Sequence, residues 1–312
     1  MKKRCLVFAG QGAQFVGMGK DLAEAYPQCR ALYESADKIL GYSLSKLCFE
    51  GPDAELTRTD RCQPAIFVTS IACWTALRLE AGNVAPAATA GLSLGEWSAL
   101  HMAGALSFED TLRLLEARGR FMQEACGRRE GGMLSVMGLD ADAIKKVCDT
   151  AGVEISNFNS PVQTVLSGER SRIAKAEELA KAAGAKKTVP LKVAGAYHSS
   201  LMEPAARRLE AMLAGVTIGK PELPVISNVT GRPHGAPEEI CRAMVRQVTS
   251  PVQWVAGVEW LRSIGVTEYI ECGPGKVLSG LISRIDSAAA VRNIQDVPSL
   301  RKTVGELARP AV

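Results

Sequence analysis

Short apolar runs that end in glycine turns alternate with longer amphipathic segments in the first 125 residues of the chain. Residues 5–9 form one such run, directly before Gly10-Gln11-Gly12, and residues 87–92 form another. Helical patterns cover residues 22–40, 65–80, 94–103 and 108–125. Strands that alternate with helices in this way pair in parallel, because each helix carries the chain back across the sheet. The sequence therefore predicts an α/β fold with a parallel sheet.

The pattern changes near residue 132. Strand patterns at residues 133–137, 153–157, 164–167 and 187–193 enclose helical patterns at 141–150 and 173–183. This β-α-β-β-α-β order is typical of a ferredoxin-like unit. Signals for a helix at 201–213, a strand at 224–228, helices at 237–247 and 254–263 and a last strand at 268–271 follow it. We expect a catalytic core of residues 1–125 and 197–312, interrupted by a small ferredoxin-like subdomain of residues 126–196.

Charge and cysteine spacing exclude several classes of protein. The 37 basic and 33 acidic residues give a net charge of only +4, so we expect no nucleic-acid partner. The nine cysteines contain no C-x-x-C pair, so we expect no metal site, and we interpret the thiols as reduced. The uncharged stretches at 63–77 and 81–95 are shorter than the roughly 20 apolar residues of a membrane span. These features indicate a soluble, cytoplasmic protein.

Residues 91–95, GLSLG, match the G-x-S-x-G pattern between a strand of small residues and a helix. A sharp strand-to-helix turn there projects the hydroxyl of Ser93 outward, and glycines on both sides avoid clashes. The amide of Leu94, at the start of the helix, can then stabilise an oxyanion. The alternative is a structural turn without chemistry.

A serine nucleophile needs a base, and the chain has three histidines. His101 lies about 12 Å along the same predicted helix from Ser93, too far to reach its hydroxyl. His234 lies in a Gly- and Pro-rich loop that favours a surface turn. His198 lies between a strand and a predicted helix that begins with the capping pattern S-x-x-E at Ser200. His198 is the best candidate base, with a capping or surface histidine as the alternative.

Arg118 lies on the apolar face of its predicted helix, three or four residues from Leu114, Leu115, Phe121 and Met122. A guanidinium on such a face must be paired or face a pocket. It either forms an internal ion pair or binds a substrate carboxylate with its two-pronged end. The residues alone leave both readings open.

The turn after the first strand holds Gln11. It fails as a dinucleotide fingerprint, because Phe15 stands where the third glycine is required. Ligands still bind at the carboxyl ends of strands in α/β sheets, so the Gln11 amide is a candidate second oxyanion donor.

With these residues identified, the chain resembles the malonyl-CoA:acyl carrier protein transacylase family over nearly its whole length. The stretches that carry the resemblance are, in chain order, FAGQGAQFVGMG, TDRCQPAIF, GLSLGE, LEARGRFMQEA, NSPVQTVLSG, AYHSSLM, SNVTG, RQVTSPVQW and ECGPGKVLSGL. The resemblance implies an α/β-hydrolase-like core with an inserted ferredoxin-like subdomain. It also implies transfer of a malonyl group to a carrier protein in fatty acid synthesis.

Position by position, the resemblance implies that Ser93 is the nucleophile and His198 its base. In the family, main-chain carbonyls near the position of Gln247 orient the histidine, so a dyad is implied. Arg118 would bind the malonyl carboxylate.

The amides of Gln11 and Leu94 would form the oxyanion hole. The further substrate-binding residues that the resemblance implies are Gln63, Met122, Asn228 and Gln247. The partners implied are malonyl-CoA and an acyl carrier protein, on a monomeric enzyme. Coenzyme A belongs to the substrate, so no separate cofactor is expected.

Two positions depart from the family pattern. Leu92 replaces the histidine of the usual GHSLGE, and Tyr197 stands where malonyl-selective relatives often have phenylalanine. Two other functions stay open at this point. A serine thioesterase or esterase would share Ser93 and His198 but has no need of Arg118 on an apolar face. A non-catalytic module that binds CoA or a nucleotide would need neither.

Overall fold

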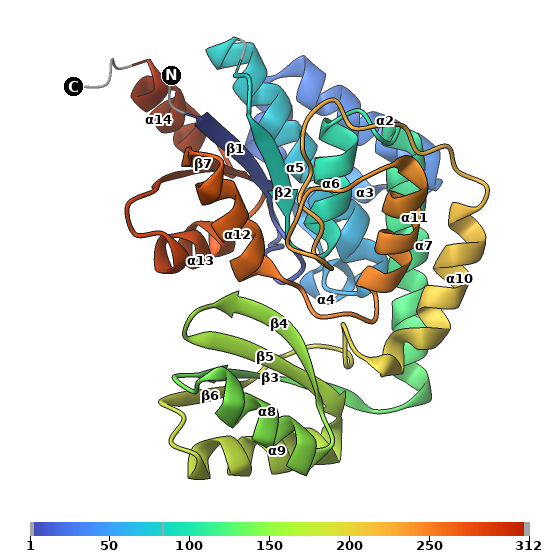
Figure 1. Cartoon of the computed structure of the whole chain (residues 1–312). Coiled ribbons are helices and arrows are strands. Elements are labelled where there is room, and N and C mark those ends of the chain that lie inside the picture. The colour runs from blue at the N-terminus through green and yellow to red at the C-terminus, as the bar shows by residue number, and fades with distance from the viewer. Residues whose placement is uncertain (1–2, 83, 309–312) are drawn as a thin grey trace.

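The computed structural model describes residues 3–82 and 84–308 and contains two four-stranded sheets (Figure 1). The larger unit is built on β1 (Lys3–Phe8), β2 (Ala88–Gly91), β7 (Val266–Cys272) and β8 (Ala290–Ile294). Their order is β2-β1-β7-β8, and all three pairings are parallel. The predicted parallel α/β sheet is confirmed. Apolar residues such as Leu6 and Ile270 are fully buried, as expected for a sheet covered on both faces.

The helices of the first 128 residues include every helix that the sequence predicts there, with one division. The predicted helix at 22–40 is two helices, because Tyr26 is extended and Pro27 begins a new helix. Proline disfavours a helical conformation in the residue before it and has no amide hydrogen to donate. The helices are α1 (Lys20–Ala25), α2 (Pro27–Leu40), α3 (Leu44–Glu50), α4 (Asp53–Leu56), α5 (Thr59–Ala81), α6 (Leu94–Met102) and α7 (Phe108–Arg128).

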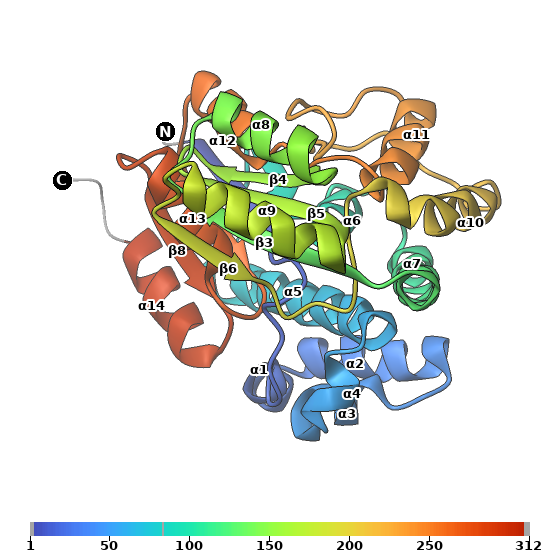
Figure 2. The ribbon, with the colours of Figure 1, turned by 90° about the horizontal axis from the view of Figure 1, so that it is seen from below.

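The second sheet is antiparallel and has the strand order β4-β5-β3-β6. Along the chain, its elements follow the predicted β-α-β-β-α-β order. They are β3 (Gly131–Met137), α8 (Ala141–Ala151), β4 (Glu154–Ser160), β5 (Gln163–Glu169), α9 (Arg170–Ala182) and β6 (Lys187–Pro190). Helices α8 and α9 cover the face that points away from the larger unit (Figures 1 and 2). The other face of this sheet is therefore turned toward the carboxyl ends of β1 and β2.

The chain then returns to the larger unit, where three predictions need correction. The predicted strand at 224–228 forms only isolated bridges, through Val225 and Ile226. The strand at 268–271 is not the last, because β8 follows it. Ser200 does not cap a helix, because its amide and hydroxyl both bond to Glu154 of the second sheet. The helices of this part are the short η1 (Ser200–Met202), α10 (Glu203–Leu213), α11 (Pro237–Gln247), α12 (Trp254–Ser263), α13 (Val277–Ile285) and α14 (Val297–Leu307).

Two expectations from composition can be compared with the structure. All nine cysteines are free thiols, and eight of them are buried. Within the described ranges, no helix combines the length and the apolar character needed to span a bilayer.

Helix α7 contains two glycines in contrasting surroundings, and they give a stability prediction. A Cβ atom on Gly119 would lie 2.4 Å from the carbonyl oxygen of Thr59, whereas one on Gly127 would meet nothing within 4 Å. Alanine favours a helix over glycine by about 1 kcal/mol. We therefore expect Gly127→Ala to raise the free energy of unfolding by up to about 1 kcal/mol. Gly119→Ala should lower it by about 1–3 kcal/mol, because overpacking outweighs propensity there.

Urea unfolding of both variants and the parent chain measures this difference. Equal stabilisation by the two substitutions would contradict the close packing of α7 against the start of α5.

Candidate active site

Ser93 occupies a tight turn between β2 and α6. A Cβ atom on Gly91 would lie 2.0 Å from the carbonyl of Gly95, and one on Gly95 would lie 2.2 Å from the Phe8 oxygen. Only glycine fits at either position, so the backbones of β1, β2 and α6 touch at this point. Ser93 itself has φ 55°, a left-handed conformation that is unfavourable for a residue with a side chain. Such strain is typical of functional positions.

His198 lies against Ser93, although 105 positions separate them in the sequence. Its Nε2 is 2.9 Å from Ser93 Oγ, and its Nδ1 is 2.7 Å from the carbonyl oxygen of Gln247. That carbonyl can only accept, so Nδ1 carries the hydrogen in the neutral ring and Nε2 is free to accept from the serine. His198 also has a positive φ, 56°. Among the described residues, Ser93 and His198 are the only non-glycine residues with this conformation.

Electrostatics keep the His198 ring neutral. Burial, and second to it the positive charge of Arg118, lower the pKa of His198 to about 4. Both effects disfavour the imidazolium, since burial removes its hydration and Arg118 repels it. At neutral pH, His198 is therefore ready to accept a proton.

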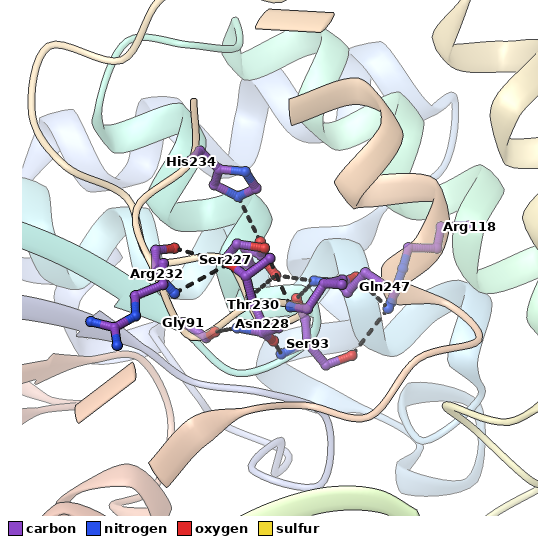
Figure 3. Close-up of polar contacts among 11 residues, drawn as sticks. Gly91, Ser93, Arg118, Ser227, Asn228, Thr230, Arg232, His234 and Gln247 are labelled. Carbon is purple, nitrogen blue, oxygen red and sulfur yellow. Dashed lines mark hydrogen bonds and ion pairs between the residues drawn. The ribbon is translucent and has the colours of Figure 1, made fainter. Parts of the chain in front are cut away.

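Arg118 is 2% exposed and reaches Ser93 from α7. Its Nη1 donates to Gln63 Oε1 at 2.6 Å. Its Nη2 donates at 3.0 Å to both Ser93 Oγ and Gln247 Oε1 (Figure 3). No carboxylate within the described ranges forms an ion pair with it, and its Nε has no acceptor. The internal ion pair considered as an alternative is not present.

Burial lowers the pKa of Arg118 to about 10, and the nearby Glu96 opposes this effect. Arg118 is consequently a buried cation at neutral pH whose hydrogen-bond partners are all uncharged. Such a group has a strong affinity for an anion placed beside Ser93.

The two predicted oxyanion donors belong to neighbouring turns. Strands β1 and β2 pair with Phe8 opposite Gly91, so the turn of Gln11 and the turn of Ser93 leave the sheet side by side. The amides of Gln11 and Leu94 have no acceptor among the described residues. Leu94 begins α6, and the partial positive charge of a helix N-terminus favours an anion there.

A polar chain fixes the Gln11 turn. The Gln11 side chain donates from Nε2 to Thr59 Oγ1 at 3.1 Å, and Thr59 Oγ1 lies 2.7 Å from the Tyr197 hydroxyl. Tyr197, noted above as a departure from the family pattern, thus uses the hydroxyl that phenylalanine lacks. Sequence reasoning missed Thr59, which carries no local signal.

A cavity of about 630 Å³ opens in front of Ser93, between the two units. Gln11, Ser93, Met122 and His198 line it from the larger unit. Polar residues from the second sheet line the opposite wall: Ser135, Asn157, Asn159 and Gln163. This wall was not predicted from the sequence. The available signal was the spacing of Asn157 and Asn159, which places both on one face of a strand.

The remaining predicted residues lie behind the cavity wall. They are Gln63, Leu94, Arg118, Asn228 and Gln247, which are all at most 3% exposed and do not line the cavity. Asn228 accepts from the Ser93 amide at 2.6 Å and donates to the Gly91 carbonyl at 2.7 Å, so it holds both sides of the turn. Gln63 contacts Arg118, as described above. Of the pocket residues implied by resemblance, Met122 faces the cavity.

Two further points concern the histidines and metals. The structure places His234 differently from the surface turn expected of it, because its side chain is 2% exposed and lies 2.7 Å from Glu96. Within the described ranges, no group of three or more His, Cys, Asp or Glu side chains could hold a metal ion.

The chain is similar to known proteins over most of its length. The acyl transferase domain family matches residues 5–310. The malonyl CoA-acyl carrier protein transacylase of Bacillus subtilis is 42% identical over 312 residues, covering 98% of each chain. The Escherichia coli protein of the same name is 43% identical over 289 residues, covering 91% of this chain and 93% of the relative.

Solved structures agree with these relatives. An acyl carrier protein S-malonyltransferase from Vibrio cholerae is 41% identical, with a TM-score of 0.93 over 96% of this chain and 99% of that one. A malonyl-transacylase in complex with its type II polyketide-synthase acyl carrier protein is 40% identical, with a TM-score of 0.94 over 97% and 99%. Each of these four matches covers at least 91% of both chains. The chain belongs to the acyl transferase domain family and, within it, to the malonyl CoA-acyl carrier protein transacylases.

Proposed function

We propose that this chain transfers a malonyl group from malonyl-CoA to the phosphopantetheine thiol of an acyl carrier protein, through a malonyl ester on Ser93. The observation that carries the proposal is that two groups, one from His198 and one from Arg118, meet at the hydroxyl oxygen of Ser93. Ser93 Oγ lies 2.9 Å from His198 Nε2 and 3.0 Å from the Nη2 of the buried Arg118. A nucleophile, a neutral base and a cation without an ion-pair partner suit an acyl group that ends in a carboxylate.

In the first half-reaction, His198 Nε2 takes the proton of Ser93 as Oγ attacks the thioester carbonyl carbon. The carbonyl oxygen becomes an oxyanion beside the amides of Gln11 and Leu94. When the carbon–sulfur bond breaks, the CoA sulfur takes the proton from His198 Nε2. The products are malonyl-Ser93 and free CoA.

The second half-reaction runs the same steps with the carrier-protein thiol as nucleophile. The thiol gives its proton to His198 Nε2, and its sulfur attacks the ester carbonyl of malonyl-Ser93. The oxyanion forms at the same two amides. The carbon–oxygen bond to Ser93 then breaks, and Oγ recovers its proton from His198.

Arg118 provides selection in this mechanism. Two charge-assisted bonds to the malonyl carboxylate hold the acyl chain with its carbonyl at Oγ. A neutral acetyl group leaves the buried cation without its anion. The same feature argues against a thioesterase of neutral substrates, which has no use for a cation at this position.

We also propose the finer division of the molecule. Residues 1–125 and 197–312 would form an α/β-hydrolase-like core, and residues 126–196 a ferredoxin-like subdomain, supported by the strand order β4-β5-β3-β6. The cavity between them suits a pantetheine arm, which both CoA and the carrier protein possess. The enzyme would act as a cytoplasmic monomer. Because the chain's own residues provide the nucleophile, base and anion site, the mechanism assigns no step to a resident cofactor.

The nucleophile assignment predicts the behaviour of two serine variants. Ser93→Ala should abolish the covalent malonyl adduct, because no other group is placed to attack. Ser98→Ala is a matched control, since Ser98 is buried in α6, which begins directly after Ser93, and its hydroxyl has no partner. Intact mass with peptide mapping, after a brief reaction with malonyl-CoA, measures the adduct. An adduct retained in Ser93→Ala would falsify the assignment.

The anion-site assignment predicts a loss of selectivity. Each of the two charge-assisted hydrogen bonds contributes about 1.5–3 kcal/mol, so Arg118→Ala should reduce malonyl loading at least about 100-fold more than acetyl loading. Arg118→Lys should recover part of the difference, because it keeps the charge but loses the planar two-pronged geometry. Single-turnover loading from both thioesters tests this. Equal losses for the two acyl groups would count against the assignment.

The low pKa of His198 predicts the acid limb of the pH–rate profile, that is, the pH at which the rate falls on acidification. Below this pKa the ring is protonated and cannot accept the serine proton, so activity falls as the pH drops through about 4 rather than 6.5. Replacing Arg118 by methionine removes the second cause of the shift and should move the limb to higher pH. The rate of Ser93 labelling by a fluorophosphonate, measured as a function of pH, reports the position of the limb. This reagent carries no carboxylate, so the loss of Arg118 does not affect its binding through an anion contact. A parent-chain midpoint near 6.5, with the fold intact by circular dichroism, would contradict the prediction.

A further inference from the structure

The mechanism above leaves one buried carboxylate beside the active site without a role. Glu96 lies in the first turn of α6, three residues after Ser93, and is 0% exposed. Its Oε2 accepts from Gln247 Nε2 at 2.5 Å and from the Asn228 amide at 3.1 Å, and its Oε1 lies 2.7 Å from His234 Nε2. Figure 3 shows Asn228, His234 and Gln247 gathered beside the Ser93 turn. These three residues are all more than 130 positions away from Glu96 in the sequence.

Glu96 fixes which way the amide of Gln247 points. The nitrogen of this amide donates to two groups that can only accept, Glu96 Oε2 and the Ser93 carbonyl oxygen at 2.9 Å. The amide oxygen must therefore face the other side, where it accepts from Arg118 Nη2 at 3.0 Å. A reversed amide would aim its NH₂ group at the guanidinium, where neither group could accept.

The loop that carries His234 locks the carboxylate in place. The amide of His234 donates to the Val225 carbonyl, and the amide of Ser227 donates to the Arg232 carbonyl, both at 2.8 Å. Residues 225–234 thereby form a small closed loop that brings His234 and Asn228 together onto Glu96 (Figure 3). Because His234 contacts Oε1, the other oxygen remains available to Gln247 and Asn228.

Charge supports the same arrangement. Among the charges near Arg118, Glu96 has the largest effect on its pKa and raises it. The two side chains are not in direct contact, because the amide of Gln247 lies between them. The carboxylate therefore stabilises the buried guanidinium across the Gln247 amide. A direct ion pair would instead occupy the hydrogen-bond donors that a substrate carboxylate requires.

We propose that Glu96, held by His234, is a positioning residue that sets the Gln247 amide and thereby orients Arg118 to select acyl groups with a carboxylate. The proposal rests on the function proposed above. It assigns to Glu96 no contact with substrate. Its effect passes through Gln247 to Arg118, so it concerns the difference between malonyl and acetyl groups more than acyl transfer itself.

The test compares single-turnover loading from malonyl-CoA and acetyl-CoA in Glu96→Gln and His234→Gln. In Glu96→Gln, we expect malonyl loading to fall about 10-fold or more and acetyl loading by less than about 3-fold, because a neutral side chain no longer dictates the Gln247 amide. His234→Gln should lower the malonyl-to-acetyl ratio in the same direction, by about 3-fold.

Glu271→Gln is the matched control. Glu271 is also a fully buried carboxylate, but it accepts from Leu278 and Ser279 at the start of α13, away from Arg118. We expect this variant to lower thermal stability and to leave the malonyl-to-acetyl ratio unchanged. If Glu96 served stability alone, Glu96→Gln would also lower thermal stability and leave the malonyl-to-acetyl ratio unchanged.

A double-mutant cycle adds a second readout. In an Arg118→Ala background, Glu96→Gln should leave the selectivity ratio unaltered, because its effect acts through Arg118. An unchanged ratio in both single variants overturns the proposal, and if Glu96→Gln does not fold, His234→Gln decides alone. A parent chain that forms no malonyl adduct on Ser93 would instead overturn the proposed function.

Discussion

The contact of three backbones at the Ser93 turn is the constraint on which the rest of the site depends. Gly91 and Gly95 let β1, β2 and α6 meet at distances that admit no side chain. This contact forces Ser93 into a left-handed conformation, which local structure alone would not maintain. The hydrogen bonds of Asn228 on both sides of the turn hold it. The Ser93 turn is therefore preorganised by sheet packing and needs no ligand to form.

Sequence patterns drew attention to Ser93 and Arg118, which the structure brings into contact, because each residue breaks a local rule. Ser93 lies between glycines at a strand-to-helix junction, and Arg118 places a charge on an apolar helix face. The parallel sheet and the β-α-β-β-α-β order were predicted for similar reasons, since both follow from local periodicity. His198 was reached by excluding His101 and His234, and the structure places it on Ser93.

The features that were missed depend on contacts between distant segments. His234 lies in a Gly- and Pro-rich loop that is typical of the surface, yet Glu96 buries its side chain. The segment at 224–228 has a strand pattern but forms only isolated bridges, and β8 adds a strand after the predicted last one. Pairing of this kind is set by tertiary packing, which periodicity along the chain does not record.

Gln247 connects parts of the site that serve different purposes. Its main-chain carbonyl holds the Nδ1 of His198, and its side-chain oxygen accepts from Arg118. In the proposed mechanism, proton transfer and acyl recognition thus both depend on Gln247, at the end of α11. In evolutionary terms this mechanism would link the two traits, because a change that shifts the end of α11 to alter recognition would also move the carbonyl that holds His198. Divergence toward other acyl groups is open instead at Arg118 and Gln63, whose replacement leaves the His198 contact intact.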